Sequence, residues 1–482
     1  MANWGIEINN FNGGFSPKWY AESYPSYGNK NQAGAMTNAD ISNPGYLTQG
    51  PGLTTLTNGT EAGAITTLIK GVTKEPPVSG ACYGTGGRIL NRIGSTAVVN
   101  TGSFPHTISA SGSSDEDGED VCHYKGNVYY SFNEGVVQGD IGIYDKATTF
   151  NDDWGSTVPS GAAQLQYGPH QIIVGGNDIM YIANGVYVAS WDGTTFIPQA
   201  LDLPTGAVVQ SLAWNQDRLY IAANTSTLVG TNKPTASVYI WDTVSSSWET
   251  EIRLMGNVGA LHNKNGTVFV WYRDMSDTTG GFKMGYINGA GITDIANYTG
   301  GVPAYYQVTD YKDFILWVSS DLIYAWGSGN KDLQVKLFQW ADGGYSTVGG
   351  LVCPFGDIVL VASNQSTSYK VAKFSGYDVN SSWKSLMFDI TWSGSISKIE
   401  KIRFNFEQLA TGARVDWKLL NNRGETIYSD IISYAKLGAV TTAFYPLNGK
   451  VQENFRVELD YTNGDTTNTV KIKNCKIYGG TD

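Results

Sequence analysis

Apolar and polar residues along most of the chain follow a repeated two-part pattern. The first part is two apolar runs separated by a short polar turn, as in "SLAWNQDRLYIAA", and the second is an aromatic run, a turn and another run, as in "SVYIWDTVSSSWETEIRL". β-Branched and aromatic residues favour strands, whereas Asp, Gly, Asn and Ser tolerate the backbone geometry of tight turns. Each copy therefore predicts an inner hairpin followed by an outer hairpin.

The turns of the predicted inner hairpins recur with a regular period. Seven residues close these turns at successive intervals of 40, 51, 39, 49, 47 and 44 positions: Gly87, Asn127, Asp178, Asp217, Gly266, Asp313 and Asp357. A period in the forties with four strands per unit is typical of propeller blades. The sequence therefore predicts an all-β protein with a seven-bladed β-propeller over residues 79–386.

From residue 387 onward the chain changes to longer, strict alternation, as in "KIRFNFE" and "NFRVELDY". One apolar face and one solvated face per strand is what a sheet packed on a second sheet requires. About seven such strands are enough for a small sandwich. Residues 387–482 are predicted to form a jelly-roll-like β-sandwich with six core residues: Phe404, Phe406, Trp417, Phe455, Val457 and Leu459.

Residues 1–78 lack the repeated pattern and are rich in Gly, Asn, Pro and Ser, yet they contain many aromatic residues. A disordered tail would lack those aromatic residues. This segment is predicted to be an extended N-terminal arm, packed either on its own propeller or on a neighbouring subunit. The candidate assembly residues of the arm are Trp4, Phe11, Phe15, Trp19 and Tyr20.

Charge and composition narrow the possible partners. The 482 residues carry a net charge of −11, and Lys and Arg form no basic stripe, which disfavours nucleic acid as the main partner. No apolar run is long enough to span a bilayer, so no membrane insertion is expected. The N-terminus lacks the features of a secretory signal, and the four cysteines lack CxxC spacing, which favours synthesis in the cytoplasm without a disulfide framework.

Candidate chemistry is sparse. There is no GxSxG, HExxH, P-loop or complete GxGxxG motif. Ordinary strand histidines are a better explanation than a metal site for His123, His170 and His262, and small buried thiols are a better one for Cys82, Cys122 and Cys353. No catalytic, cofactor-binding or metal-binding residue is predicted.

Two acidic features have structural interpretations. The run "SSDEDGEDV" at residues 113–121 fails as a calcium loop, because position 12 would be Tyr124, and it is predicted to be a solvated loop rather than a cation site. Asp145, Asp192, Asp242 and Asp342 are predicted to bond the backbone of their own turns.

Several segments together resemble a known class of proteins. An opening "NNFNGGFSPKW", then "NPGYLTQGPGLTTL", a degenerate propeller and a terminal "ENFRVELDYTNGDTTNTVKIKNCKIYG" resemble virion structural proteins of tailed bacteriophages. The resemblance implies a non-enzymatic assembly module of the tail, neck or adhesion apparatus, located in the virion and needing no cofactor. Its expected partners are other virion proteins, copies of itself and a host surface glycan.

Two other function classes stay open. Exposed Trp and Tyr side chains on propeller loops would also suit a carbohydrate-binding or glycan-cleaving protein. A kelch-like adaptor is less favoured, because the double-glycine signature is not kept.

Overall fold

A computed structural model describes most of the chain. The described residues are 3–8, 11, 33–37, 39–40, 46–61, 65–68, 81–84, 88–93, 98–99, 106–109, 116–145, 149–225, 235–274, 281–319, 322–328, 335–341, 347–352, 360–365, 368–377, 381–389, 397–451, 454–462 and 464–481. Over these residues the only helices are three short ones: α1 (Trp154–Thr157), α2 (Tyr434–Leu437) and the 3-10 helix η2 (Tyr305–Gln307). The all-β prediction is confirmed.

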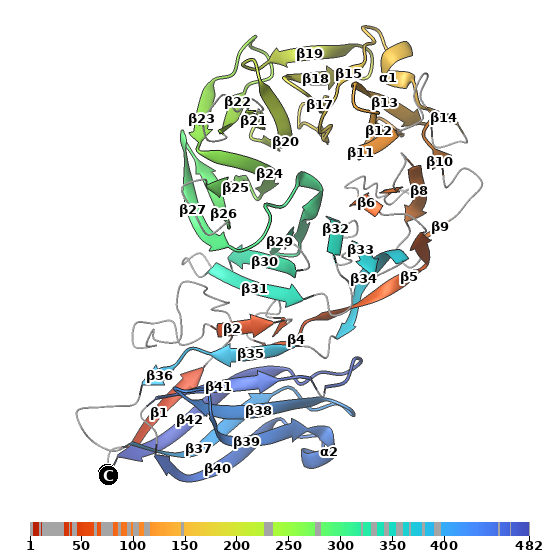
Figure 1. Ribbon diagram of the computed structural model, residues 1–482. Coiled ribbons are helices and arrows are strands. Elements are labelled where there is room, and N and C mark those ends of the chain that lie inside the picture. The colour runs from red at the N-terminus through yellow and green to blue at the C-terminus, as the bar shows by residue number, and fades with distance from the viewer. Residues whose placement is uncertain are drawn as a thin grey trace.

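Many of the strands form antiparallel sheets of four consecutive strands, and these sheets lie in a ring (Figure 1). The first strand of each sheet, called the inner strand below, faces the middle of the ring. Five of the sheets run β11 (Glu116–Tyr124), β12 (Asn127–Glu134), β13 (Gln138–Tyr144), β14 (Phe150–Asn151), with β15 (Leu165–Gln166) on β13; β16 (Ile172–Val174), β17 (Met180–Asn184), β18 (Tyr187–Trp191), β19 (Phe196–Asp202); β20 (Ala207–Asn215), β21 (Arg218–Thr225), β22 (Ala236–Trp241), β23 (Thr250–Leu254); β24 (Gly256–Lys264), β25 (Thr267–Asp274), β26 (Phe282–Asn288), β27 (Gly291–Tyr298); and β28 (Val308–Tyr311), β29 (Phe314–Ser319), β30 (Leu322–Ser328), β31 (Val335–Ala341).

Two further ring sheets contain strands from the segment that was expected to be an arm. One contains β6 (Ile65–Leu68), β7 (Ala81–Gly84), β8 (Arg88–Ile93) and β10 (His106–Thr107), with β9 (Val98–Val99) on β8. The other contains β32 (Thr347–Val352), β33 (Leu360–Gln365) and β34 (Ser368–Tyr377), with β5 (Pro51–Glu61) as its outermost strand. β6 contacts β32 and β33, so these two sheets are neighbours.

The predicted boundary at residue 78 is therefore corrected, since β5 and β6 precede it and belong to the ring sheets. β5 pairs with a strand more than 300 residues away, so no local hairpin turn accompanies it. The repeated pattern, which depends on such turns, could not mark it.

The C-terminal region forms two sheets that share a core. One contains β1 (Asn3–Ile8), β42 (Ile472–Thr481), β37 (Ser397–Phe406) and β40 (Thr442–Val451); the other contains β2 (Ala33–Thr37), β35 (Ser382–Ser385), β41 (Asn454–Asp460), β38 (Arg414–Asn421) and β39 (Thr426–Ser433), with β36 (Phe388–Asp389) on β41; β3 (Ala39–Asp40) and β4 (Thr48–Gln49) form a separate hairpin. The ring centroids of Phe404 and Trp417, one from each sheet, are 5.2 Å apart. All six predicted core residues are buried.

One apolar core joins this C-terminal unit to the ring. The cluster that contains Phe404 and Trp417 also contains Leu316 of the ring strand β29. Phe11 lies in the same cluster and packs edge-on against Trp383, with ring centroids 5.0 Å apart. The two parts of the molecule are therefore packed directly against each other.

The candidate assembly residues of the N-terminal segment can be placed in part. Trp4 lies in β1, where its backbone pairs with Gly479 of β42, and Phe11 is buried in the shared core. Phe11 is therefore not available for contact with another subunit. Phe15, Trp19 and Tyr20 lie outside the described residues.

The inner hairpin turns lie where the periodicity predicted them. Gln216 and Asp217 both have positive φ, of 48° and 58°, and Asn265 and Gly266 have φ of 51° and 80°. Two central residues with positive φ define the type I′ turn, whose twist matches that of paired strands. Gly87 and Asp357 lie outside the described residues.

Candidate functional site

A cavity of about 170 Å³ lies among the inner strands of consecutive ring sheets. Its walls come from β11, β20 and β24, from η2, and from the segment that contains β16. Aliphatic side chains form part of the lining, together with three aromatic, two amide and two ionisable residues: Trp214, Tyr305, Tyr306, Gln171, Asn263, Asp120 and His262. A mainly apolar concavity with a few polar groups is typical of small-molecule sites.

Five inner strands contain a β-bulge, one of them β6, where Thr66 is left without a partner in the register. In the other four, the unpartnered residues are Glu119 in β11, Gln210 in β20, Gly259 in β24 and Gly349 in β32. A bulge inserts one residue, bends the strand and redirects side chains, and bulges are frequent beside active sites. Glu119 is the one acidic residue of this set.

Glu119 is held by one residue of the neighbouring strand β12 and one of η2. Asn133 Nδ2 donates to Glu119 Oε1 at 2.9 Å. The Tyr305 hydroxyl donates to the backbone oxygen of Glu119 at 2.8 Å and lies 3.5 Å from its Oε2. Since Tyr305 lines the cavity, one tyrosine connects the carboxyl group to it.

The pKa of Glu119 is raised to about 7. Burial is the main cause, the charge of Asp120 adds to it, and the hydrogen bonds from Tyr305 and Asn133 only partly oppose it. Protonated and ionised forms of Glu119 therefore coexist near neutral pH. A carboxyl group in this state can serve as a general acid.

Asp120 connects two inner strands as well as lining the cavity. Its Oδ2 accepts from the backbone N of Ile172 at 2.8 Å, and its Oδ1 accepts from the backbone N of Val121 at 2.9 Å. The same link recurs around the ring: Gln171 Oε1 accepts from Leu212 N at 2.5 Å and Ser211 Oγ from Leu261 N at 2.9 Å. The cavity is thus surrounded by strands that are bonded to one another.

The aromatic side of the cavity depends on the bulge at Gly259. A Cβ atom at this position would lie 2.4 Å from the backbone oxygen of Pro303, so only glycine allows the approach. The segment after Pro303 continues into η2, where the rings of Tyr305 and Tyr306 meet edge to face with centroids 5.1 Å apart. The close approach thus places both tyrosines at the cavity.

The second ionisable residue of the cavity lining, His262, lies on β24. His262 Nε2 is 2.9 Å from Asp310 Oδ1, and Lys264 Nζ donates to the same oxygen at 3.1 Å. Burial alone would raise the pKa of Asp310, but the hydrogen bond and charge of His262 and the charge of Lys264 lower it to about 2. The Asp310 carboxylate therefore stays ionised and fixes the ring of His262.

The histidines named from the sequence do not converge. His262 lines the cavity, whereas His170 is fully buried, with Nδ1 2.9 Å from Ala183 O, and burial lowers its pKa to about 4. His123 lies half-buried in β11. Within the described parts of the chain, no group of three or more His, Cys, Asp or Glu side chains is arranged to hold a metal ion.

The predicted turn aspartates behave as expected where they are described. Asp192 Oδ1 accepts from the backbone N of Thr194 and Thr195, both at 2.7 Å, and Asp242 Oδ1 accepts from Val244 N and Ser245 N. Asp145 Oδ1 accepts from Thr149 N at 3.1 Å. Asp342 and Cys353 lie outside the described residues, while Cys122 is half-buried and burial raises the pKa of its thiol.

The acidic run requires a correction. Residues 113–121 were expected to be a solvated loop, but β11 begins at Glu116, and Glu116 and Asp120 are buried. The acidic composition hid the strand, because strand propensity disfavours Asp and Glu. Glu119 was missed for this reason, and Trp214, Tyr305 and Tyr306 were missed because many aromatic residues serve equally well as core.

No protein-family model and no curated protein sequence matches the chain. Solved structures do: an exo-β-1,3-galactanase from Phanerochaete chrysosporium with galactose is 10% identical over 67% of this chain and 98% of its own, with a TM-score of 0.31. A glycoside hydrolase family 43 arabinoxylan arabinofuranohydrolase from Bacillus subtilis is 12% identical over 75% and 95%, with a TM-score of 0.28. An aldose sugar dehydrogenase from Streptomyces coelicolor is 12% identical over 67% and 97%, with a TM-score of 0.36.

These comparisons contradict the prediction of a non-enzymatic protein, and they do not test the resemblance to virion tail, neck or adhesion proteins. The matched structures are a galactanase, a glycoside hydrolase and a sugar dehydrogenase, all of them enzymes. Their identities and TM-scores transfer no activity to this chain, whose function has to follow from its own residues. A search of the described helices for a membrane-spanning segment finds none.

Proposed function

We propose that the chain recognises carbohydrate and takes a sugar residue into the cavity among the inner strands. The supporting observation is the lining: the half-buried indole of Trp214 and the rings of Tyr305 and Tyr306 offer faces for a sugar ring, beside the amides of Gln171 and Asn263. Trp214 is itself stacked on Tyr181, with centroids 5.9 Å apart and planes 13° from parallel. The platform is therefore held in place before a ligand arrives.

Glycan cleavage is the second candidate. It is favoured by Glu119, whose pKa of about 7 suits a proton donor, next to the Asp120 carboxylate, which accepts two backbone N–H groups. Glycosidases pair a protonated carboxyl group with an ionised one. In this role Glu119 would donate the proton to the leaving oxygen, and Tyr305 would position it.

Tyr306→Ala tests sugar binding. The measurement is titration of galactose, glucose, xylose, arabinose and N-acetylglucosamine, followed by tryptophan fluorescence, to which Trp214 contributes. We expect at least one sugar to bind, and Tyr306→Ala to weaken it by about tenfold, or about 1.4 kcal/mol. The matched control is Tyr167→Ala, which removes an exposed tyrosine that lies in the ring of sheets but outside the cavity. Binding of none of the sugars, or equal weakening by both variants, contradicts the proposal.

Glu119→Gln tests cleavage on any polymer that contains the bound sugar. Gln keeps an acceptor for Asn133 Nδ2 but cannot lose or supply the proton, so we expect turnover to fall by 100-fold or more, within the range of general-acid contributions. The rate of the unmodified protein should fall as pH rises through about 7. Glu425→Gln is the control, and a flat pH profile above 6 would assign Glu119 a purely structural role.

The fold that this proposal uses is a seven-bladed β-propeller followed by a β-sandwich. The four-strand sheets, the contact of β6 with β32 and the outer position of β5 support a ring that is closed by pairing the two ends of the propeller. The shared core of the two C-terminal sheets supports the sandwich.

Location in a virion, with other virion proteins or copies of this chain as partners, is a separate prediction that follows from the sequence resemblance. Mass spectrometry of purified phage particles from the source tests it. A carbohydrate-recognising propeller on such a particle would contact a host surface glycan.

A further inference from the structure

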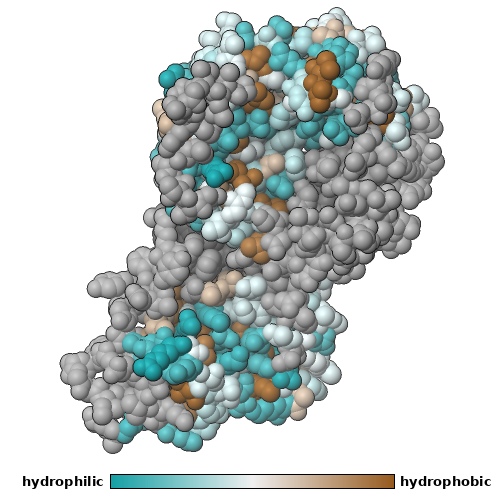
Figure 2. All heavy atoms as spheres, viewed as in Figure 1, coloured by the Kyte–Doolittle hydropathy of each residue, from teal (hydrophilic) through white to brown (hydrophobic). Residues whose placement is uncertain are grey.

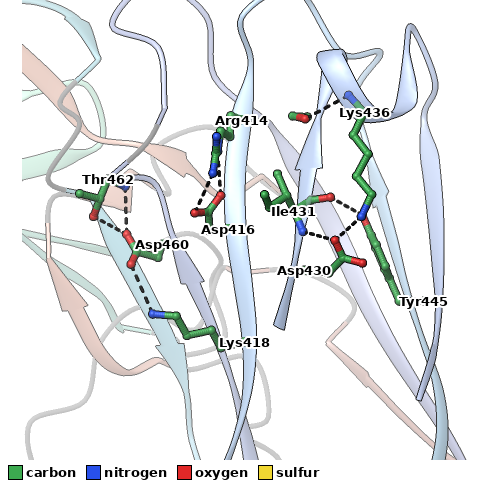
Figure 3. A network of polar contacts seen from close by, with 10 residues as sticks. Arg414, Asp416, Lys418, Asp430, Ile431, Lys436, Tyr445, Asp460 and Thr462 are labelled. Carbon is green, nitrogen blue, oxygen red and sulfur yellow. Dashed lines mark hydrogen bonds and ion pairs between the residues drawn. The ribbon is translucent and has the colours of Figure 1, made fainter. Parts of the chain in front are cut away.

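The two outward faces of the C-terminal unit differ in how their charges are matched. On the sheet that contains β38, β39 and β41, cations are paired with carboxylates (Figure 3): Arg414 binds Asp416 at 2.8 and 3.2 Å, and Lys418 lies 3.6 Å from Asp460 Oδ2. Lys436 likewise pairs with Asp430. On this face, each of these three cations is therefore paired with a carboxylate of the same face.

On the other sheet, three cations lie over aromatic rings, while Lys471 and Glu407, just beyond the ends of β42 and β37, form an ion pair at 3.0 Å. Lys401 Nζ is 4.7 Å from the centroid of Tyr478, and the guanidinium of Arg403 is 5.2 Å from that of Phe444. Lys476 is 5.5 Å from Tyr478 and pairs with Glu7 at 3.3 Å. Three cations and one carboxylate thus gather on one face of a protein whose net charge is −11.

The strand register arranges these side chains in rows. Tyr478 lies opposite Lys401, and in the next row Lys476, Arg403 and Phe444 lie side by side on β42, β37 and β40. The third row is Asn474, Asn405 and Thr442. With strands about 4.8 Å apart and alternate residues about 7 Å apart, the rows cover roughly 10 by 14 Å, the extent of a few sugar units.

The third row supplies hydrogen-bonding groups. Asn405 Nδ2 donates to Asn474 Oδ1 at 2.7 Å, and Thr442 Oγ1 donates to Asn405 Oδ1 at 3.0 Å. Arg403 Nε also donates to Asn405 Oδ1 at 3.0 Å, which orients the guanidinium beside Phe444. Phe444 is nevertheless 59% exposed.

We infer that this face, formed by Lys401, Arg403, Phe444, Lys476 and Tyr478, is a second binding site, which takes an acidic oligosaccharide. The aromatic rings suit sugar faces, the amides suit hydroxyl groups, and the cations are complementary to ring carboxylates, which Arg binds in bidentate fashion. Three cations are few for a nucleic acid, whose binding depends on neutralising many phosphates. On the side of the C-terminal unit that Figure 2 shows, the described residues are mostly hydrophilic, with scattered apolar ones.

The test measures binding of the full chain to polygalacturonate, with fully methyl-esterified polygalacturonate as the uncharged counterpart. We expect binding only to the charged polymer, weakened about tenfold by Arg403→Gln and by Phe444→Ala, with thermal unfolding unchanged. The control for Arg403→Gln is Arg423→Gln, in an exposed turn. The control for Phe444→Ala is Tyr167→Ala, at a residue of the ring of sheets that is about as exposed as Phe444. Both should bind like the unmodified protein.

Four outcomes would overturn the inference: no binding, equal binding of the esterified polymer, equal binding of duplex DNA, or equal weakening by the controls. The ring cavity is tested separately, because Tyr306→Ala should keep polygalacturonate binding and Arg403→Gln should keep monosaccharide binding. Failure of one site is therefore distinguishable from failure of the other.

Discussion

Asp140 is a fully buried carboxyl group in β13 with no catalytic role assigned to it. It accepts from the backbone N of Ile141 at 2.7 Å and from Ser156 Oγ at 2.6 Å. Burial, assisted by the charges of Glu134 and Asp153, still raises its pKa to about 7. At neutral pH and above, the folded protein therefore bears the cost of an ionised buried group.

The sign of the pH effect follows from proton binding. Between about pH 4 and pH 7 the folded state holds a proton at Asp140 that the unfolded state has lost, so this group's contribution to stability falls as pH rises through that window. Burial lowers the pKa of His170 to about 4, so its contribution has the opposite sign and falls as pH drops below about 6.5.

Asp140→Asn isolates the first effect. Asn keeps the acceptor for Ile141 N and removes the charge, so we expect the variant to gain stability over the unmodified protein at pH 8, on the order of 3 kcal/mol, and less at pH 5. Thermal unfolding at both pH values measures this, with Asp202→Asn as an exposed control. His170 is present in both proteins and cancels. An equal difference at both pH values contradicts the raised pKa.

At the scale of elements, two asparagines make the same contact between neighbouring sheets. Asn133 is the second-last residue of β12 and exchanges two hydrogen bonds with the backbone of Gly168, both at 3.1 Å. Asn224 is the second-last residue of β21 and exchanges two with Val258, at 2.8 and 3.0 Å. Each side-chain amide thus bonds one ring sheet to the backbone at or just before the first strand of the next sheet.

Asn224→Ala leaves the N–H and C=O of buried Val258 without these partners. Each unsatisfied buried polar group costs about 1–3 kcal/mol, so we expect a loss of about 2–4 kcal/mol in the free energy of unfolding. Urea denaturation measures it, with Asn297→Ala on the exposed outer strand β27 as control. If both variants lose the same free energy of unfolding, the hydrogen bonds between Asn224 and Val258 do not stabilise the packing of the two sheets.

The sequence predicted local elements better than long-range ones. The inner and outer hairpins around "SVYIWD" were predictable because alternation and turn residues are local signals, and β22 and β23 are an outer hairpin as expected. The site was not predictable, because Glu119, Trp214 and Tyr305 meet only through the ring. One signal was available: Asn133 and Asn224 each lie six residues after the first residue of their strand, a repeat that the turn period did not include.

At the scale of the whole molecule, the first 61 residues connect three parts of the fold. β1 lengthens one C-terminal sheet, β2 lengthens the other, and β5 is the outermost strand of a ring sheet. Their sequence looked like loop because each strand pairs with a distant partner and needs no hairpin of its own. In the proposed propeller, β5 is the strand that joins the two ends of the ring.

Two deletions separate these roles. Removing residues 2–8 takes away β1 and buried Ile8 alone, so we expect a less stable C-terminal unit but unchanged sugar binding in the ring. Removing residues 2–61 also takes away Phe11 and β2 to β5, and it leaves β34 as an exposed edge, so we expect early unfolding of the ring, aggregation and loss of sugar binding. Thermal unfolding and fluorescence titration measure both.

A peptide of residues 46–61, added to the longer deletion, decides whether β5 is the cause. Backbone pairing of Thr54 with Lys373 and of Thr55 with Ala372 sets a defined register for it. Since strand addition at an open edge gains a full set of backbone hydrogen bonds, the peptide should restore the unfolding temperature of the ring and sugar binding. It should not restore the stability that β1 and β2 give the C-terminal unit. A scrambled peptide is the control, and a ring that keeps its unfolding temperature without residues 2–61 would show that β5 does not close it.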